Sequence, residues 1–133
     1  MHCKNRSWTT QAYKDWSATV FHRLSSEENL KALEDLREFF DSEKHSYKVD
    51  IKFTYPKNIL FTKKGSMSAR AHDLSNIEKP LIDLIFLPCY FDKPSPYGCK
   101  NLNIDDKFIS ALSSKKLPGD EHFIEIDLTI IDL

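Results

Sequence analysis

The chain reads YKVDIKFTY from Tyr47 to Tyr55, and apolar side chains alternate there with polar ones. Alternation with a period of two places the apolar set on one face of a β-strand and the polar set on the other. Pro56 ends the run, because proline has no backbone N–H for a sheet ladder. This stretch predicts a strand with one buried face, against which the rest of the chain must pack.

Two helices are predicted before this strand. An apolar stripe at helical spacing starts at Thr9 or Thr10 and reaches Leu24. Ser25 and Glu28 have the spacing of a capping box, which predicts the start of a second helix. The side chains expected to face the core are Tyr13, Trp16, Val20, Phe21 and Leu24 in the first helix, and Leu30, Leu33, Leu36 or Arg37, and Phe40 in the second.

An amphipathic helix is predicted after the strand, over residues 73–86. Asn76, Lys79 and Asp83 share a narrow polar stripe, and apolar residues fill the other side. Pro80 fits this helix if its missing N–H falls in or near the first turn, and otherwise kinks it. Between the strand and this helix we expect a short second strand over 59–61 and a turn over 63–66.

The C-terminal part predicts a long loop and two further strands. Three prolines and Gly98 mark residues 88–103 as a loop. A short extended or edge segment is expected over 108–112, a turn over 118–120 and a final strand over 123–133. The expected fold class is therefore mixed α/β (α+β), a single domain with a small mixed sheet packed with helices.

Composition excludes several classes of protein. The chain has 133 residues, 41% hydrophobic residues and a formal net charge of −1, which excludes a polycationic tail protein and a strongly acidic solvating protein. No apolar run approaches the roughly 18 residues of a membrane span, and no signal peptide is recognised, so we expect a cytoplasmic protein without a membrane partner. The three cysteines are expected as free thiols, with Cys89 and Cys99 as the alternative of zinc ligands.

The near-zero net charge is a sum of separate patches. Residues 57–72 contain four bases and no acid, whereas residues 117–133 contain five acids and no Lys or Arg. A basic segment of this kind suits contacts with DNA phosphates, and a mobile surface loop is the equal alternative. The bases are Lys57, Lys63, Lys64 and Arg70.

The carboxylates near the polar helical stripe could serve metal chemistry. Mg²⁺ prefers oxygen ligands, usually one or two carboxylates with substrate phosphate, and Lys79 would add a positive charge for a phosphate. This combination suits metal-assisted phosphodiester hydrolysis. The alternative is ordinary helix chemistry, because Asp and Asn often cap helices and Lys79 with Asp83 is a common i,i+4 pair.

The segment HDLSNIEKPLID, from His72 to Asp83, resembles the signature of the RusA family of Holliday junction resolvases. That signature runs D-L-D-N, two residues, K, three residues, D. The pair in DDKFI, from Asp105 to Ile109, is similar to a second family landmark. Weaker similarities are KNR at 4–6, QAY at 11–13, the lysines Lys115 and Lys116, and the final strand.

The resemblance implies a homodimeric, Mg²⁺-dependent endonuclease (with Mn²⁺ as an alternative) of phage or prophage type that nicks four-way DNA junctions. It assigns catalysis to Asp73, Lys79 and Asp106, and metal binding to Asp73 and Asp106, with Asp105 beside them. Residues expected to support the metal ligands are Ser75, Asn76 and Asp83. Residues expected to contact DNA are Lys57, Lys63, Lys64, Arg70, Lys115 and Lys116.

The chain departs from the signature at Ser75, where the family has an acid. Loss of this carboxylate weakens the expected metal site unless Asp105, Asp83 or His72 compensates. A branched-DNA-binding protein without efficient cleavage is therefore the alternative function. A small interaction domain, whose partner surfaces are the acidic second helix and the final strand, is the third.

Overall fold

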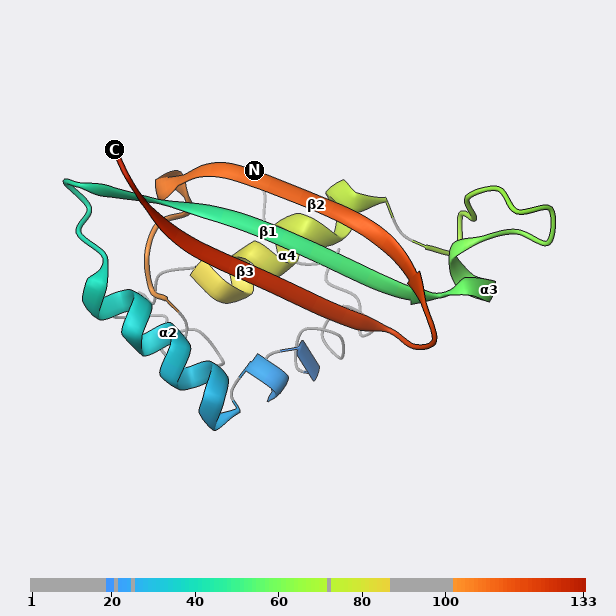
Figure 1. Ribbon diagram of the computed structural model, residues 1–133, viewed down its shortest axis with the longest axis horizontal. Coiled ribbons are helices and arrows are strands. Elements are labelled where there is room, and N and C mark those ends of the chain that lie inside the picture. The colour runs from blue at the N-terminus through green and yellow to red at the C-terminus, as the bar shows by residue number, and fades with distance from the viewer. Residues whose placement is uncertain (1–18, 21, 25, 72, 87–101) are drawn as a thin grey trace, which may run out of the picture.

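The computed structural model describes residues 19–20, 22–24, 26–71, 73–86 and 102–133 (Figure 1). A three-stranded mixed sheet has the order β2-β1-β3. The central strand β1 (His45–Pro56) pairs in parallel with β2 (Ile109–Gly119) and antiparallel with β3 (Phe123–Asp132). The helices are α2 (Glu27–Phe39), α3 (Lys57–Leu60) and α4 (Leu74–Phe86), with a 3₁₀ turn η2 (Asp106–Phe108). The expected mixed α+β class is confirmed.

The alternation in β1 produces the predicted buried face. All five apolar residues from Tyr47 to Tyr55 are buried, and Lys48 between them is exposed. Burial raises the pKa of the Tyr47 phenol to about 12, because the charged phenolate is disfavoured away from water. The inward residues of β3 extend this apolar face as predicted, and they are Ile124, Ile126, Leu128 and Ile130.

Helix α2 begins one residue later than the capping-box spacing predicted. Ser26, and not Ser25, caps it, and its hydroxyl accepts a hydrogen bond from the Asn29 backbone N–H at 3.3 Å. This position lets Leu33 point into the core, as expected. Residues 19–20 and 22–24 are helical, and the rest of the predicted first helix lies outside the described residues.

An aromatic cluster joins four elements of the core. Phe40, which follows α2, stacks on Tyr47 of β1 with ring centroids 4.6 Å apart. Phe108 of η2 meets Phe40 edge-on at 5.6 Å, and Phe86 of α4 meets Tyr47 edge-on at 5.3 Å. Such pairs contribute beyond their buried area. The cluster fixes the position of η2 relative to α4.

The expectation of a short strand before α4 is wrong, and Pro80 falls in the interior of α4. The predicted strand over 59–61 is the short helix α3, followed by an isolated bridge between Phe61 and Met67, since three apolar residues cannot establish a period. Pro80 is the seventh residue of α4, beyond the first turn. Its missing N–H leaves the Asn76 carbonyl without its helical donor, and Asn76 is exposed, so solvent can replace that donor.

Strand β2 is longer than predicted. It is an edge strand, as expected, but it runs to Gly119 and not to Leu112, and the turn follows at 120–122. The polar run SSKK at 113–116 shows no alternation of apolar and polar residues, because both faces of an edge strand are largely exposed. The sequence pattern therefore does not indicate a strand there. Pro118 is compatible with this edge position. The loop predicted over 88–103, with both Cys89 and Cys99, lies almost entirely outside the described residues.

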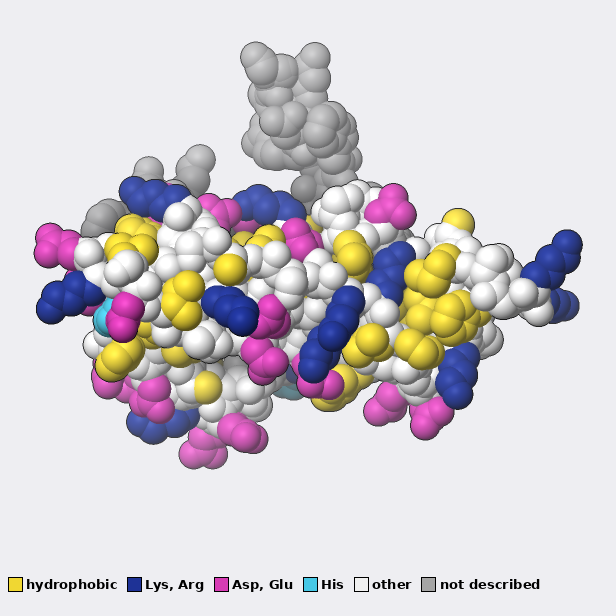
Figure 2. All heavy atoms as spheres, turned by 45° about the horizontal axis from the view of Figure 1, so that its top comes forward, with side chains coloured by type: hydrophobic (Ala, Val, Ile, Leu, Met, Phe, Trp, Pro, Cys, Tyr) yellow, Lys and Arg dark blue, Asp and Glu magenta, His cyan; other side chains and the backbone are white. Residues whose placement is uncertain are grey.

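The outer face of the sheet carries mixed charges. In register, Lys52 lies between Lys115 and Glu125, and Asp50 lies between Ser113 and Asp127. Figure 2 shows lysines and acids interspersed over the visible surface. None of the helices in the described part of the chain has the length and apolar character that a membrane crossing requires.

Candidate active site

Lys79 joins two carboxylates that come from different parts of the chain. Its Nζ lies 2.8 Å from Asp83 Oδ1, one turn further along α4, and 2.7 Å from Asp106 Oδ2 in η2. The first contact follows from helical spacing. The second brings together the two segments that resemble the family motifs. We call Lys79, Asp83 and Asp106 the lysine–carboxylate cluster.

Asp106 is held in place by the segment that returns to the end of α4. The Leu102 and Ile104 N–H groups donate to the carbonyls of Ile85 and Phe86 at 2.8 and 2.9 Å, which satisfies two otherwise free carbonyls of the helix end. Asp105 then caps η2 by accepting from the Lys107 N–H at 2.8 Å. Phe108 anchors the other end of η2 in the aromatic cluster.

The electrostatics of the cluster favour its charged form. The hydrogen bond to Asp106, followed by that to Asp83, raises the pKa of Lys79 above its ordinary value. The hydrogen bond from Lys79 lowers the pKa of Asp106 below its ordinary value. Two carboxylates share one ammonium, so the cluster has one net negative charge at neutral pH.

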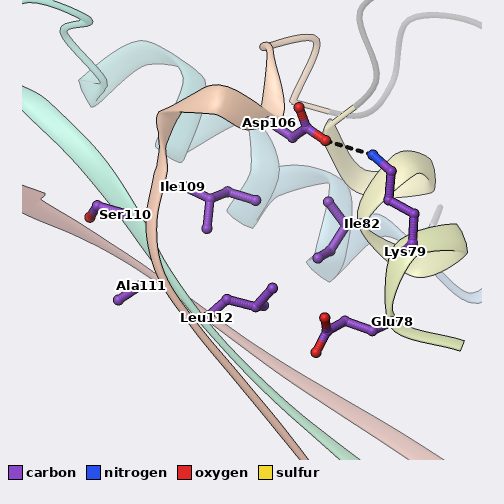
Figure 3. Close-up of a pocket in the computed structure, with 8 residues that line it drawn as sticks. All are labelled: Glu78, Lys79, Ile82, Asp106, Ile109, Ser110, Ala111 and Leu112. Carbon is purple, nitrogen blue, oxygen red and sulfur yellow. Dashed lines mark hydrogen bonds and ion pairs between the residues drawn. The ribbon is translucent and has the colours of Figure 1, made fainter. Parts of the chain in front are cut away.

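A shallow pocket of about 310 Å³ lies beside the cluster (Figure 3). Glu78, Lys79 and Ile82 of α4 form one wall, Asp106 stands at the rim, and residues 109–112 of β2 form the other wall. Glu78 also accepts a hydrogen bond from the Ser114 hydroxyl of β2. The pocket thus places an ammonium and two carboxylates between one helix and one sheet edge.

The other predicted site residues are not gathered into this pocket. Asp73 lies directly before α4, is exposed, and accepts through its backbone carbonyl from the Asn76 N–H at 2.9 Å. Ser75 and Asn76 are exposed on the first turn of α4 and do not line the pocket. The Asp105 carboxylate caps η2. His72 lies outside the described residues.

The pocket offers few acids for a metal ion. Across the described stretches, no three His, Cys, Asp or Glu side chains form a group that could enclose a metal ion. Mg²⁺ commonly takes one or two protein carboxylates and completes its shell with water and substrate phosphates. Glu78 and Asp106 both line the pocket, but Figure 3 shows their carboxylates at opposite ends of it, so the structure does not bring them to one cation.

The predicted DNA-binding residues of 57–72 occupy one end of the molecule. Lys57 starts α3, and Lys63 and Lys64 lie on the turn between Thr62 and Ser66, all three exposed. This turn projects from the body in Figure 1. The Arg70 guanidinium has a structural role, since it donates to the Asn58 carbonyl at 2.5 Å and the Ser68 hydroxyl at 3.3 Å.

Lys115 and Lys116 lie on opposite faces of β2. Lys116 is paired with buried Phe53 and donates to the Ala71 carbonyl, just before α4, at 3.5 Å. Lys115 is paired with Lys52 on the outer face. Successive residues of a strand alternate in direction, so Lys116 shares the face of α4 and Lys115 does not.

Sequence reasoning missed Glu78 and Ser114. Glu78 stands beside Lys79 in the motif, but no spacing rule singles it out. Ser114 is in the part of β2 that the sequence did not predict. If the strand is continued from Leu112 through residues 113–116, its alternation of side-chain directions places Ser114 and Lys116 on the same face as Leu112.

Comparison with known proteins identifies no relative of this chain. No family model matches the chain, and no curated protein or solved structure matches it significantly.

Proposed function

We propose that this protein is a structure-specific endonuclease that nicks four-way DNA junctions in recombination or repair, as the RusA family does. The observation that carries the proposal is the contact between Lys79 and Asp106. The two motifs were singled out separately in the sequence, and a chance resemblance gives no reason for them to meet at one pocket. The resemblance and the geometry therefore agree on Lys79 and Asp106, whereas Asp73 lies outside the pocket.

Lys79 has the position and the spare bonding capacity to hold a phosphate. Its ammonium has three N–H donors, and two carboxylates occupy two of them. The side chain is 62% exposed, so the third donor is accessible to DNA. A fixed positive charge beside the scissile phosphate stabilises the negative charge that develops during hydrolysis.

Asp106 and Asp83 hold Lys79 in place before DNA arrives. Preorganised groups of this kind lower the barrier because they do not reorient during the reaction. Mg²⁺, or Mn²⁺ in its place, would supply Lewis acidity toward the water and the phosphate, with Asp106 among its ligands and Asp73 contributing if it turns toward the site. Lys116 is available for a neighbouring phosphate on the same face.

Symmetric nicking of a junction needs two active sites, so the proposed enzyme is a homodimer. The proposed setting is the cytoplasm of a bacterial or phage-infected cell. The basic turn with Lys63 and Lys64 is proposed to extend the DNA contact beyond the pocket.

The test is incubation of the purified protein with a synthetic four-way junction and a linear duplex in Mg²⁺. Paired nicks in the junction that vanish with Asp73→Asn or Asp106→Asn support the proposal. Tight junction binding without nicks would favour the branched-DNA-binding alternative. Failure to bind branched DNA at low salt would contradict both and leave an interaction domain.

A further inference from the structure

We propose that the free edge of β3 and the groove beside it bind an extended basic segment of another protein, which adds to the sheet as a fourth strand. β3 lies at the edge of the sheet opposite to β2, which carries one wall of the pocket beside the lysine–carboxylate cluster (Figure 1). This peptide site is therefore independent of the proposed nuclease function.

The two edges of the sheet differ in how they are protected against further strands. β2 carries Lys115, Lys116 and Pro118, and its pairing with β1 shifts register near its start. Lysines, prolines and bulges of this kind discourage strand addition. β3 pairs with β1 over ten residues without a register shift, and its sequence FIEIDLTIID contains no proline or lysine. No other strand of the described chain pairs with β3, so alternate backbone N–H and C=O groups along it are open to another strand.

A groove of about 590 Å³ lies beside the first half of β3. Its apolar lining comes from Val20 and Leu24, in the helical segment before α2, and from Ile124 and Ile126 of β3. Both isoleucines pack against the core but stay partly exposed, whereas the β1 residues paired with them are buried. An added strand can place every second side chain over this lining, and burial of that apolar surface favours binding.

The charge along this edge favours a basic partner. Glu125 and Asp127 line the groove, are exposed, and form no ion pair with another described residue. Arg23 contributes one positive charge from the helical wall. Residues 117–133 contain five acids and no Lys or Arg, so the negative charge extends along the strand. Lysine or arginine at alternate positions of an added strand would face these acids, and opposite charges on paired strands attract.

A second copy of β3 fits this edge less well. Antiparallel pairing of two β3 strands centred on Ile126 places Glu125 of one copy opposite Asp127 of the other. Like charges directly opposite each other on paired strands are destabilising. The acids that attract a basic segment therefore repel another β3, which favours a different protein as the partner.

The test uses three fluorescently labelled peptides of nine residues as probes. The first alternates valine with lysine, and the second has glutamate in place of every lysine. The third is the first peptide with N-methyl groups on two consecutive central residues, which removes an N–H donor from each edge of the strand. Strand addition depends on these donors, whereas simple charge attraction does not.

Two charge-reversed variants are compared with the wild type. Glu125→Lys combined with Asp127→Lys reverses the charge of the groove. Glu34→Lys combined with Glu38→Lys is the matched control, because it changes the net charge equally at exposed positions of α2 that do not line the groove. Melting temperatures of both variants establish that they are folded.

We expect the valine–lysine peptide to bind the wild type and the α2 control at least about tenfold more tightly than either other peptide. The groove variant should reverse the preference and bind the glutamate peptide more tightly than the lysine peptide. Amide hydrogen exchange should slow along β3 when the lysine peptide binds to the wild type.

Equal binding of the N-methylated peptide would overturn strand addition, and so would slowed exchange confined to other elements. A preference that does not reverse in the groove variant would overturn the choice of a basic partner, and failure of the wild type to bind the lysine peptide would overturn the whole proposal. Sedimentation velocity covers the remaining occupant: a wild-type dimer that the lysine peptide dissociates would assign the edge to a second copy of this chain instead.

Discussion

The Lys79 ammonium lies 2.7 Å from the Asp106 carboxylate, although the two residues are 27 positions apart in the chain. This contact links the polar side of α4 to η2, at the entrance to β2. It is made outside the core, with Lys79 62% and Asp106 42% exposed. An exposed ion pair of this kind contributes little to stability.

Removing the ion pair is expected to cost little stability. Lys79→Met should lower the free energy of unfolding by less than about 1 kcal/mol, because both side chains are solvated and salt screens their attraction. Urea denaturation of the wild type and the variant measures this difference. A loss above about 3 kcal/mol would contradict the account, since a loss of that size is typical of a buried pair.

The contribution of Asp106 is expected to depend on pH. Lys79 lowers the pKa of Asp106 below its ordinary value of 3.8, so the stabilisation is complete above that value and is lost as the pH falls through the native pKa. The matching contribution of Lys79, whose pKa is raised, is lost only at strongly alkaline pH, above the ordinary lysine pKa of 10.5. The stability difference between wild type and Asp106→Asn should therefore be constant from about pH 5 to 9 and shrink below about pH 4. An unchanged difference at about pH 3 would contradict this assignment of the pKa shift.

The parallel pairing of β1 and β2 predicts a specific steric coupling. A methyl group at Gly119 would overlap the Thr54 Cγ2 methyl. Gly119→Ala is expected to lower the free energy of unfolding by about 1–3 kcal/mol, and Thr54→Ser, which removes that methyl, should recover much of the loss. Gly65→Ala is the control, because the positive φ of 85° at Gly65 strains alanine without any contact to Thr54. Equal effects of Thr54→Ser in both backgrounds would contradict the pairing.

The two lysines of β2 are expected to differ in DNA binding. Lys116→Met should weaken junction binding roughly tenfold near 0.1 M salt and reduce the salt slope by about one, as loss of one phosphate contact does. Lys115→Met, on the outer face, should leave both quantities close to the wild type. Titrations at several salt concentrations measure them. A larger effect of Lys115→Met would place the DNA on the other face of the sheet.

The elements with a clear period were predictable from the sequence. β1 and β3 follow from strict alternation and α4 from its apolar stripe, so Lys79 and Asp83 could be placed on one helical face in advance. The sequence predicts edge strand β2 too short because its exposed polar residues obscure the period. It predicts a strand in place of helix α3 because residues 59–61 are too few to show a period.

The site was predictable only in its local part. Lys79 and Asp83 follow from helical spacing, whereas the family resemblance alone implies that Lys79 and Asp106 belong to one site, and their direct contact is not predicted. Glu78 gives no sequence signal, because its position in the pocket depends on Ser114 in β2. Non-local placement of this kind is set by packing between elements, which periodicity does not describe.

The central claim is that Lys79 and Asp106 act as a unit in phosphodiester hydrolysis. The most direct test is a double-mutant cycle of single-turnover nicking rates on a four-way junction in Mg²⁺, with Lys79→Met, Asp106→Asn and the double variant. Lys31→Met is the matched control, because Lys31 forms a similar i,i+4 pair with Asp35 on α2. We predict that each site variant loses about a hundredfold or more, that the double variant is little worse than either, and that the control nicks normally. Wild-type nicking rates in Lys79→Met and Asp106→Asn would contradict the claim.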